Sequence, residues 1–270
     1  MDIEEIRQLI EKSLSPNINL IDNELYGIHY GDKKKKNIKK ILMTVDLSLK
    51  AIHYAIKNKI NLIISFYGLI HKPIIMFNNN LINKLNLLSK YPISIFILNS
   101  SLISAEGGIS DIISELLFLK LEHTFNIMNF NNLEIPIGRI CSPKFYTNER
   151  EDLTLNTLIK RIKQNYNIDK IIYVGELNKV LKKICIIGGE LFKIDYLEKA
   201  SKLGCDCFIS GKINFLGASY ANDIGICIIK IPFYESLCVA LKKLNNILSL
   251  EYPNEEFVFF QYDNPIQVFK

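Results

Sequence analysis

The sequence has few of the residues from which metal and disulfide sites are built. Its 270 residues include only four histidines and six cysteines, and no two cysteines show the Cys-x-x-Cys spacing of zinc or redox motifs. Most of the cysteines lie in apolar runs, which favours free thiols in the core over metal ligands or disulfides. They are Cys141, Cys185, Cys205, Cys207, Cys227 and Cys238.

Long apolar runs and a targeting signal are also missing. No run approaches the roughly 18 apolar residues that a membrane-spanning helix requires. The first residues, Met1 to Glu5, lack the basic start and apolar stretch of a signal peptide. We therefore expect a cytoplasmic protein with no membrane partner. Hydrophobic residues make up 49% of the chain, which is enough for a sizeable core in one large domain or two small ones.

Segments typical of strands and helices alternate along most of the chain. Apolar runs predict buried strands at residues 41–45, 61–65, 93–98, 184–187 and 205–210, and apolar residues at helical spacing fill the stretches between them. This alternation is typical of β-α-β units, which form largely parallel sheets. The predicted fold class is therefore α/β, with two similar lobes whose mostly parallel sheets are flanked by helices.

The stretch from residue 119 to residue 146 separates two series of such segments. It contains Asn-rich turns and one short predicted strand near residues 136–141. We place the domain boundary there and predict a first α/β lobe over residues 1–125 and a second over residues 126–270. The final helix and tail of the second lobe can pack back on the first.

Two parts of the chain are similar to each other. Residues 39–65 begin with Lys-Lys-Ile, read as strand, helix and strand, and end on a serine; residues 182–210 do the same and are two residues longer. This similarity suggests two halves built on one plan, with strand ends that face a shared cleft. A chance likeness between two generic β-α-β units is the alternative.

Positive charge is concentrated in one segment. The formal net charge is +5, and Lys33 to Lys36, with Lys39 and Lys40, supply much of the local excess. Such a run can bind the phosphate backbone of a nucleic acid. The alternative is a solvated loop before a strand, because the whole chain is rich in Ile, Lys and Asn, as AT-biased coding would produce.

The strand at residues 61–65 ends in a loop that begins Phe66-Tyr67-Gly68. The carboxyl ends of strands are where open α/β sheets usually bind their ligands. An active metal site would need imidazole or carboxylate groups there. The sequence supplies two aromatic rings instead.

Short motifs occur in a fixed order over nearly the whole chain. They are ILMTVD (41–46), LIIS (62–65), LIHKP (69–73), AEGGISD (105–111), IGRI (137–140), CSPK (141–144), IGG (187–189), FISG (208–211) and Glu235. Through them the chain resembles the GTP cyclohydrolase I type 2 homologues, also called the NGG-interacting-factor-three family. The resemblance implies a two-lobed α/β protein that assembles into a ring-shaped homohexamer and whose relatives hold two metal ions.

The resemblance also implies five metal-ligand positions, of which this chain retains one, Glu235. Phe66 and Tyr67 replace an adjacent histidine pair, Ile103 replaces an aspartate, and Ile231 replaces a histidine. Phenyl and branched alkyl groups cannot bind a metal ion. We therefore expect no metal ion, no other cofactor and no catalytic residue at these positions.

A rearranged site would need replacement ligands, for which His71 and Tyr67 are the candidates. A protonated phenol is a poor ligand, and one histidine with one glutamate does not make a dinuclear centre. Lys212 places positive charge where relatives often have an acidic residue. Gly107 and Gly108 precede a helix and can present backbone N–H groups to an anion, although a glycine turn required by backbone geometry is the commoner explanation.

Three hypotheses follow from these observations. The first is a member of this family that keeps the fold and the ring assembly, lacks the metal chemistry, and acts as a binding or scaffold protein. The second is a metal-dependent hydrolase that acts through a rearranged site with two divalent ions on a nucleotide or cyclic substrate such as GTP. The third is a nucleic-acid-binding protein that uses the loop from Lys33 to Lys36.

Overall fold

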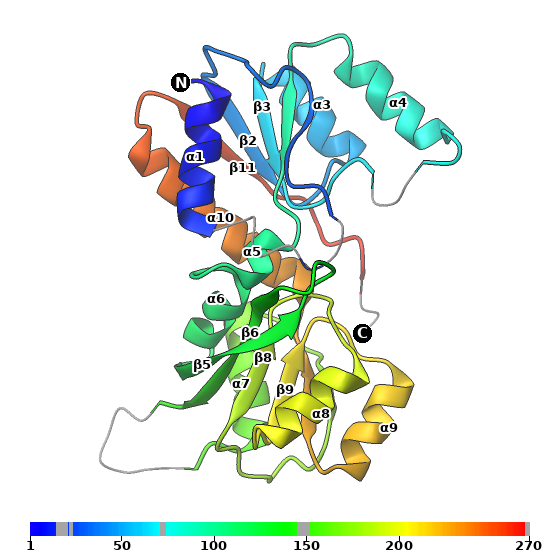
Figure 1. The fold of residues 1–270 in the computed structure, drawn as a ribbon, viewed down its shortest axis with the longest axis vertical. Helices are drawn as coiled ribbons and strands as arrows, with labels where there is room; N and C mark the ends of the chain where they lie inside the picture. The colour runs from blue at the N-terminus through cyan, green and yellow to red at the C-terminus, as the bar shows by residue number, and fades with distance from the viewer. Residues whose placement is uncertain (15–20, 22–23, 71–73, 145–151, 268–270) are drawn as a thin grey trace. The chain divides into compact units, whose positions relative to one another are not determined.

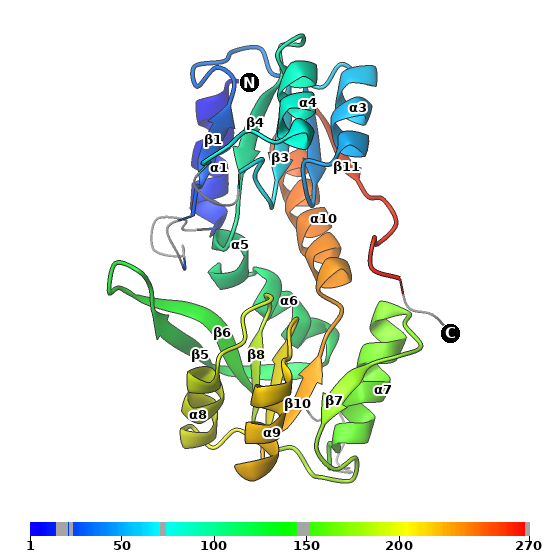
Figure 2. The same cartoon turned by 90° about the vertical axis from the view of Figure 1, so that its right-hand side faces the viewer.

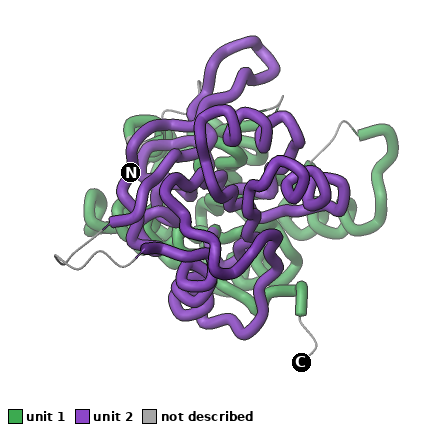
Figure 3. The backbone as a smooth tube through the Cα atoms, turned by 90° about the horizontal axis from the view of Figure 1, so that it is seen from below, with its two compact units in different colours: residues 1–102, 237–270 green, residues 103–236 purple. Residues whose placement is uncertain are grey.

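The computed structural model describes residues 1–14, 21, 24–70, 74–144 and 152–267. The chain folds as two compact units, which Figure 3 shows in two colours. Unit 1 comprises Met1–Leu102 and Leu237–Lys270, and unit 2 comprises Ile103–Ser236. The boundary predicted between residues 125 and 126 falls within a strand of unit 2, β5 (Leu119–Met128). No helix in the described part of the chain is both long and apolar enough to cross a membrane.

Unit 1 contains a five-stranded sheet in the order β1-β4-β3-β2-β11. The strands β4, β3, β2 and β11 are parallel, and β1 is antiparallel to β4. Helices α3 and α4 cover one face of the sheet, and α1 and α10 cover the other (Figures 1 and 2). The elements, of which α5 and α10 also include residues of unit 2, are α1 (Ile3–Leu14), β1 (Gly27–Tyr30), β2 (Lys40–Thr44), α3 (Leu49–Lys57), β3 (Leu62–Ser65), α4 (Asn79–Leu88), β4 (Ser94–Ile97), α5 (Ser101–Ser104), α10 (Phe233–Glu251) and β11 (Glu256–Phe260).

Unit 2 contains a six-stranded sheet in the order β5-β6-β8-β9-β10-β7. The central strands β8, β9 and β10 are parallel, whereas β5, β6 and β7 form antiparallel pairs. Helices α8 and α9 lie on one face and α6 and α7 on the other (Figures 1 and 2). The remaining elements are α6 (Ile109–Leu116), β6 (Glu134–Pro143), α7 (Leu155–Tyr166), β7 (Ile172–Val174), β8 (Ile184–Ile187), α8 (Ile194–Lys202), β9 (Cys207–Ser210), α9 (Phe215–Asp223) and β10 (Cys227–Lys230).

These two sheets confirm the predicted α/β class. The sheet of unit 1 is mostly parallel, as expected, but that of unit 2 is mixed because the hairpin β5-β6 adds to its edge in the antiparallel sense. The alternation of Leu119, Leu121, Phe125 and Ile127 with polar residues is a signal for β5 that the sequence prediction missed, although the side chains from Lys120 to Thr124 are exposed.

The start of the parallel sheet in unit 1 is fixed by two side chains. The side-chain oxygen of Asn61 accepts hydrogen bonds from the backbone N–H groups of Lys39 and Lys40, at 3.0 and 3.1 Å. The ammonium group of Lys35 donates to the backbone oxygens of Asn61, at 2.9 Å, and of Pro92. These contacts join the segments that precede β2, β3 and β4.

Unit 2 repeats the same arrangement at equivalent positions. A carboxylate oxygen of Asp206 accepts from the backbone N–H groups of Lys182 and Lys183, at 2.7 and 2.9 Å. The ammonium group of Lys179 donates to the backbone oxygen of Gly225, which precedes β10 as Pro92 precedes β4. The strand orders β1-β4-β3-β2 and β7-β10-β9-β8 also agree, including the antiparallel edge strand. The internal similarity detected in the sequence therefore reflects two copies of one structural plan.

We predict that Lys35→Met lowers the free energy of unfolding by about 1–2 kcal/mol, because two backbone oxygens each lose the hydrogen bond from its ammonium group. The matched control is Lys33→Met, which removes an equal charge from an exposed neighbour in the same loop and should change stability by less than about 0.5 kcal/mol. Urea unfolding followed by circular dichroism measures both changes. Equal stability of the two variants would contradict the structural role of Lys35.

Candidate functional site

The carboxyl end of β3 carries the aromatic pair predicted from the sequence. The backbone N–H groups of Phe66 and Tyr67 donate to the oxygens of Thr44 and Val45, at 3.3 and 3.0 Å, so both residues continue the pairing of β3 with β2. The two rings meet edge to face, with centroids 4.8 Å apart and an interplanar angle of 89°. Phe66 is only 3% exposed. This strand end is therefore closed by hydrocarbon.

Asn99 follows β4 at the same edge of the sheet. Its backbone N–H donates to the oxygen of Phe66 at 3.0 Å, and its side-chain amide donates to the oxygen of Leu25. The residue adopts a left-handed conformation with φ of 46°, which asparagine tolerates better than most residues. The amide thus holds the segment before β1 against the end of β4.

The strand ends of unit 2 are also packed with apolar groups. A methyl group built on Gly189 would lie 2.7 Å from Cδ1 of Ile103, and one built on Gly211 would lie 2.9 Å from Cβ of Phe233. Glycine is required at Gly211, where the close atom is attached directly to the backbone of Phe233, whereas the close atom at Gly189 is the end of the flexible Ile103 side chain. Ile103 and Ile231 are 5% and 0% exposed. The residues at two metal-ligand positions implied by the resemblance are therefore buried and apolar.

Glu235, the retained ligand position, lies in the first turn of α10. Its neighbour Ser236 shares a 2.9 Å hydrogen bond with the phenol oxygen of Tyr166. Burial raises the pKa of Tyr166 to about 12; the bond to Ser236 opposes this shift, and the Glu235 carboxylate adds to it. The carboxylate thus lies near a protonated phenol, which is a poor metal ligand.

The remaining candidate ligands do not complete a metal site. The described residues contain no group of three His, Cys, Asp or Glu side chains placed to hold a metal ion. All six cysteines are buried free thiols, as predicted, and burial raises the pKa of Cys141 to about 12, so that its thiol stays protonated. Lys212 is exposed beyond β9. His71, the predicted replacement ligand, lies outside the described residues.

A dinuclear hydrolytic centre requires several imidazole or carboxylate donors for each ion. The positions at which the resemblance places them hold Phe66, Ile103 and Ile231, whose side chains have no donor atom. The donor set in the described residues does not fit a pair of metal ions.

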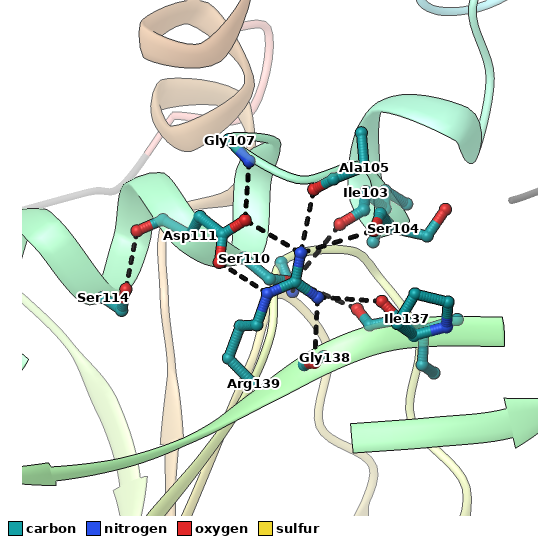
Figure 4. Close-up of polar contacts among 12 residues, drawn as sticks. Ile103, Ser104, Ala105, Gly107, Ser110, Asp111, Ser114, Ile137, Gly138 and Arg139 are labelled. Carbon is teal, nitrogen blue, oxygen red and sulfur yellow. Dashed lines mark hydrogen bonds and ion pairs between the residues drawn. The ribbon is translucent and has the colours of Figure 1, made fainter. Parts of the chain in front are cut away.

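The motifs AEGGISD and IGRI meet at a buried ion pair (Figure 4). Nε and Nη2 of Arg139 donate to the two carboxylate oxygens of Asp111, at 2.5 and 2.8 Å. Arg139 is 3% exposed and Asp111 is 8% exposed. The other guanidinium contacts are with the backbone oxygens of Ser104, Ala105, Pro136 and Gly138.

The glycine turn before α6 belongs to this network. The N–H of Gly107 donates to the Asp111 carboxylate at 2.7 Å, and the N–H of Gly108 donates to the oxygen of Ala105 at 3.0 Å. Gly107 has φ of +69°, a conformation that glycine adopts without strain. Both N–H groups are engaged within the protein, so the turn serves the backbone geometry, in agreement with the commoner explanation, and offers no anion site through them.

A third motif, IGG, joins the same cluster through Ser110. The Ser110 hydroxyl oxygen accepts from the N–H of Gly188 at 3.0 Å and lies 3.0 Å from the backbone oxygen of Ile137. Three of the motifs that carry the resemblance, AEGGISD, IGRI and IGG, therefore meet at one point of unit 2. The sequence did not identify these contacts, although one signal was present: Arg139 is a single charge within the apolar segment 135–141.

The predicted lysine surface is smaller than the sequence suggested. Lys35 is engaged by backbone oxygens, and loss of solvation on burial lowers the pKa of its ammonium group, against the attraction of Asp32. Lys39 lies 3.8 Å from Glu255, and Lys40 lies 2.7 Å from Glu256.

Comparisons with known proteins agree with the fold. The model of the family described as Duf34/NIF3 (NGG1p interacting factor 3) matches residues 1–265. A protein of Clostridium perfringens named GTP cyclohydrolase 1 type 2 homolog is 27% identical over 91% of this chain and 90% of its own length. One of the same name from Methanocaldococcus jannaschii is 26% identical over 92% and 95%.

Solved structures share the fold at lower identity. The hypothetical protein SA1388 of Staphylococcus aureus has a TM-score of 0.81 at 21% identity, with 100% of this chain and 99% of that one covered. Reduced HcgD from Methanocaldococcus jannaschii has a TM-score of 0.78 at 22% identity, with 97% and 98% covered.

We predict that Arg139→Met lowers the free energy of unfolding by about 3–5 kcal/mol, because the carboxylate of Asp111 is left buried without its partner. The double variant Arg139→Met with Asp111→Leu should be more stable than this single variant, since no buried charge remains unpaired. As a control, Arg7→Met removes a partly exposed ion pair with Glu4 and should cost less than about 1 kcal/mol. Urea unfolding tests all three. A loss from Arg139→Met no larger than that from Arg7→Met would refute this role.

Proposed function

The chain belongs to the Duf34/NIF3 (NGG1p interacting factor 3) family, and on that premise we propose that it is a non-catalytic member which keeps the family fold as a binding or scaffold protein. The observation that carries the proposal is the replacement of donor groups by buried hydrocarbon at Phe66, Ile103 and Ile231. A binding role needs only the folded surface, which the packed strand ends preserve.

The physical argument concerns both binding and chemistry. A metal ion releases bound water only when protein donors replace it, and aromatic or branched alkyl side chains offer no such replacement. Without the ion, no bound water is acidified to make a nucleophile at neutral pH. The Phe66 ring lies edge to face on Tyr67 and offers no lone pair to an ion.

The competing function is that of a metal-dependent hydrolase. Relatives are named GTP cyclohydrolase 1 type 2 homolog, so GTP is the substrate to test first. A hydrolase would have to use further ligands, such as His71 or Tyr67, in addition to Glu235. It would lose its metal and its activity together when Glu235 is changed.

We predict that the purified protein, loaded with Zn²⁺, Mn²⁺ or Fe²⁺ and then desalted, retains well under one ion per chain and does not turn over GTP. Elemental analysis by mass spectrometry measures the metal, and Glu235→Gln should leave its content unchanged. The combined variant Phe66→His, Tyr67→His, Ile103→Asp and Ile231→His should gain bound metal, because it restores the missing donors. Its thermal unfolding must be cooperative for that comparison to count.

One result would contradict the non-catalytic proposal. About two ions per chain in the unaltered protein, lost together with GTP turnover in Glu235→Gln, would establish the hydrolase and end the non-catalytic proposal.

We also propose, from the family resemblance, that the protein assembles as a homohexamer. Size-exclusion chromatography with light scattering should give the mass of six copies of the 31.1 kDa chain. A monomer or dimer at micromolar concentration would rule out this assembly, whatever the metal content.

A further inference from the structure

Unit 1 carries unpaired positive charge at the edge of its sheet that is opposite to Phe66 and Tyr67. Because β2, β3 and β4 are parallel, the segments that precede them lie along one edge. The contacts of Lys35 with the oxygens of Asn61 and Pro92 place the lysine loop against the starts of β3 and β4. The basic edge consists of Lys33, Lys34, Lys36, Lys59 and Lys90, all of which are exposed.

The charges of the basic edge are available to a partner. Among the described residues, none of its five lysines takes part in an ion pair. Lys39 and Lys40 lie at the same edge but are paired with Glu255 and Glu256, so they are not included. Asp32 is the acidic residue of the loop, and one of its carboxylate oxygens accepts from the backbone N–H of Lys34 at 2.8 Å.

Lys59 occupies a position where the backbone favours glycine. Its φ is 56°, in the left-handed region, and the equivalent residue of unit 2 is Gly204, with φ of +77°. A lysine there costs free energy relative to glycine, because its Cβ crowds the backbone. Its side chain is exposed and adds a further charge to the basic edge.

An aromatic ring adjoins the same edge. Tyr91 follows Lys90 and is 44% exposed. Exposed aromatic rings beside lysines are typical of single-strand binding, in which bases stack while phosphates meet the charges. A membrane surface would require several apolar side chains to insert, and Tyr91 is the one large exposed apolar residue within positions 31–40, 57–61 and 89–93.

We propose that the basic edge binds single-stranded nucleic acid, with its lysines on the phosphate backbone and the Tyr91 ring stacked on a base. This surface differs from the loop of four lysines predicted from the sequence, since Lys35 is excluded and Lys59, Lys90 and Tyr91 are added. It is separate from the metal-ligand positions, so failure of the nucleic-acid proposal would leave the proposal of a non-catalytic family member unaffected.

The experiment measures binding of labelled 20-nucleotide dT and rU strands to the full chain by fluorescence anisotropy at several salt concentrations. Neutralising Lys33, Lys34 and Lys36 to Gln should weaken binding at least tenfold at about 0.1 M salt and reduce the slope of log affinity against log salt by about 2, because each lost phosphate contact removes roughly 0.7. Tyr91→Ala should weaken binding with little change in that slope, as expected for lost stacking.

The matched control neutralises Lys160, Lys182 and Lys202 to Gln, three exposed lysines of unit 2, and so changes the net charge equally. It should keep the affinity and slope of the unaltered protein. Equal losses in the two triple variants would show non-specific attraction and overturn the proposal. Absence of binding by the unaltered protein would overturn it as well, as would binding to phosphatidylserine vesicles in place of both strands.

Discussion

The buried pair of Asp111 and Arg139 is the constraint on which unit 2 depends most. Two charges removed from water are tolerated only when every donor and acceptor is satisfied, and here the carboxylate and the guanidinium each bind backbone groups as well as each other. The pair thus fixes the turn before α6 against the strand β6. Motifs that indicate a family need not contain its catalytic residues. In this chain the motifs AEGGISD and IGRI supply contacts that stabilise the fold of unit 2.

The duplicated plan shows how far the sequence could predict the fold. The strand-helix-strand segments and their matching ends were visible because buried strands leave apolar runs. The contacts that make the two copies equivalent could not be recognised in the sequence. The residues differ, although the amide of Asn61 and the carboxylate of Asp206 both accept hydrogen bonds from the backbone before the neighbouring strand. The alternating residues of β5 were not recognised as a strand, because its exposed middle and the Asn-rich turn that follows favoured a loop, so the boundary was placed inside it. Nor could one lysine in a run of four be identified as structural, since only the fold brings Lys35 to the oxygens that it binds.

For the candidate site, the sequence showed which metal-ligand positions implied by the resemblance hold apolar residues. It could not show how those apolar residues pack. Ile103 lies directly against Gly189, and Phe233 against Gly211, so these strand ends have become part of the apolar packing. Restoring a donor at such a place changes the core as well as the ligand set. The loss of ligands and the packing of the scaffold are therefore physically linked at these positions.

The order of the two units along the chain has a consequence for synthesis. Unit 2 is continuous, whereas unit 1 needs both Met1–Leu102 and the residues from Leu237 onward, including β11, which pairs with β2. On the ribosome the second unit can finish folding while the first still waits for its last strand. Until that strand emerges, the open side of β2 is an unprotected sheet edge that can pair with another chain.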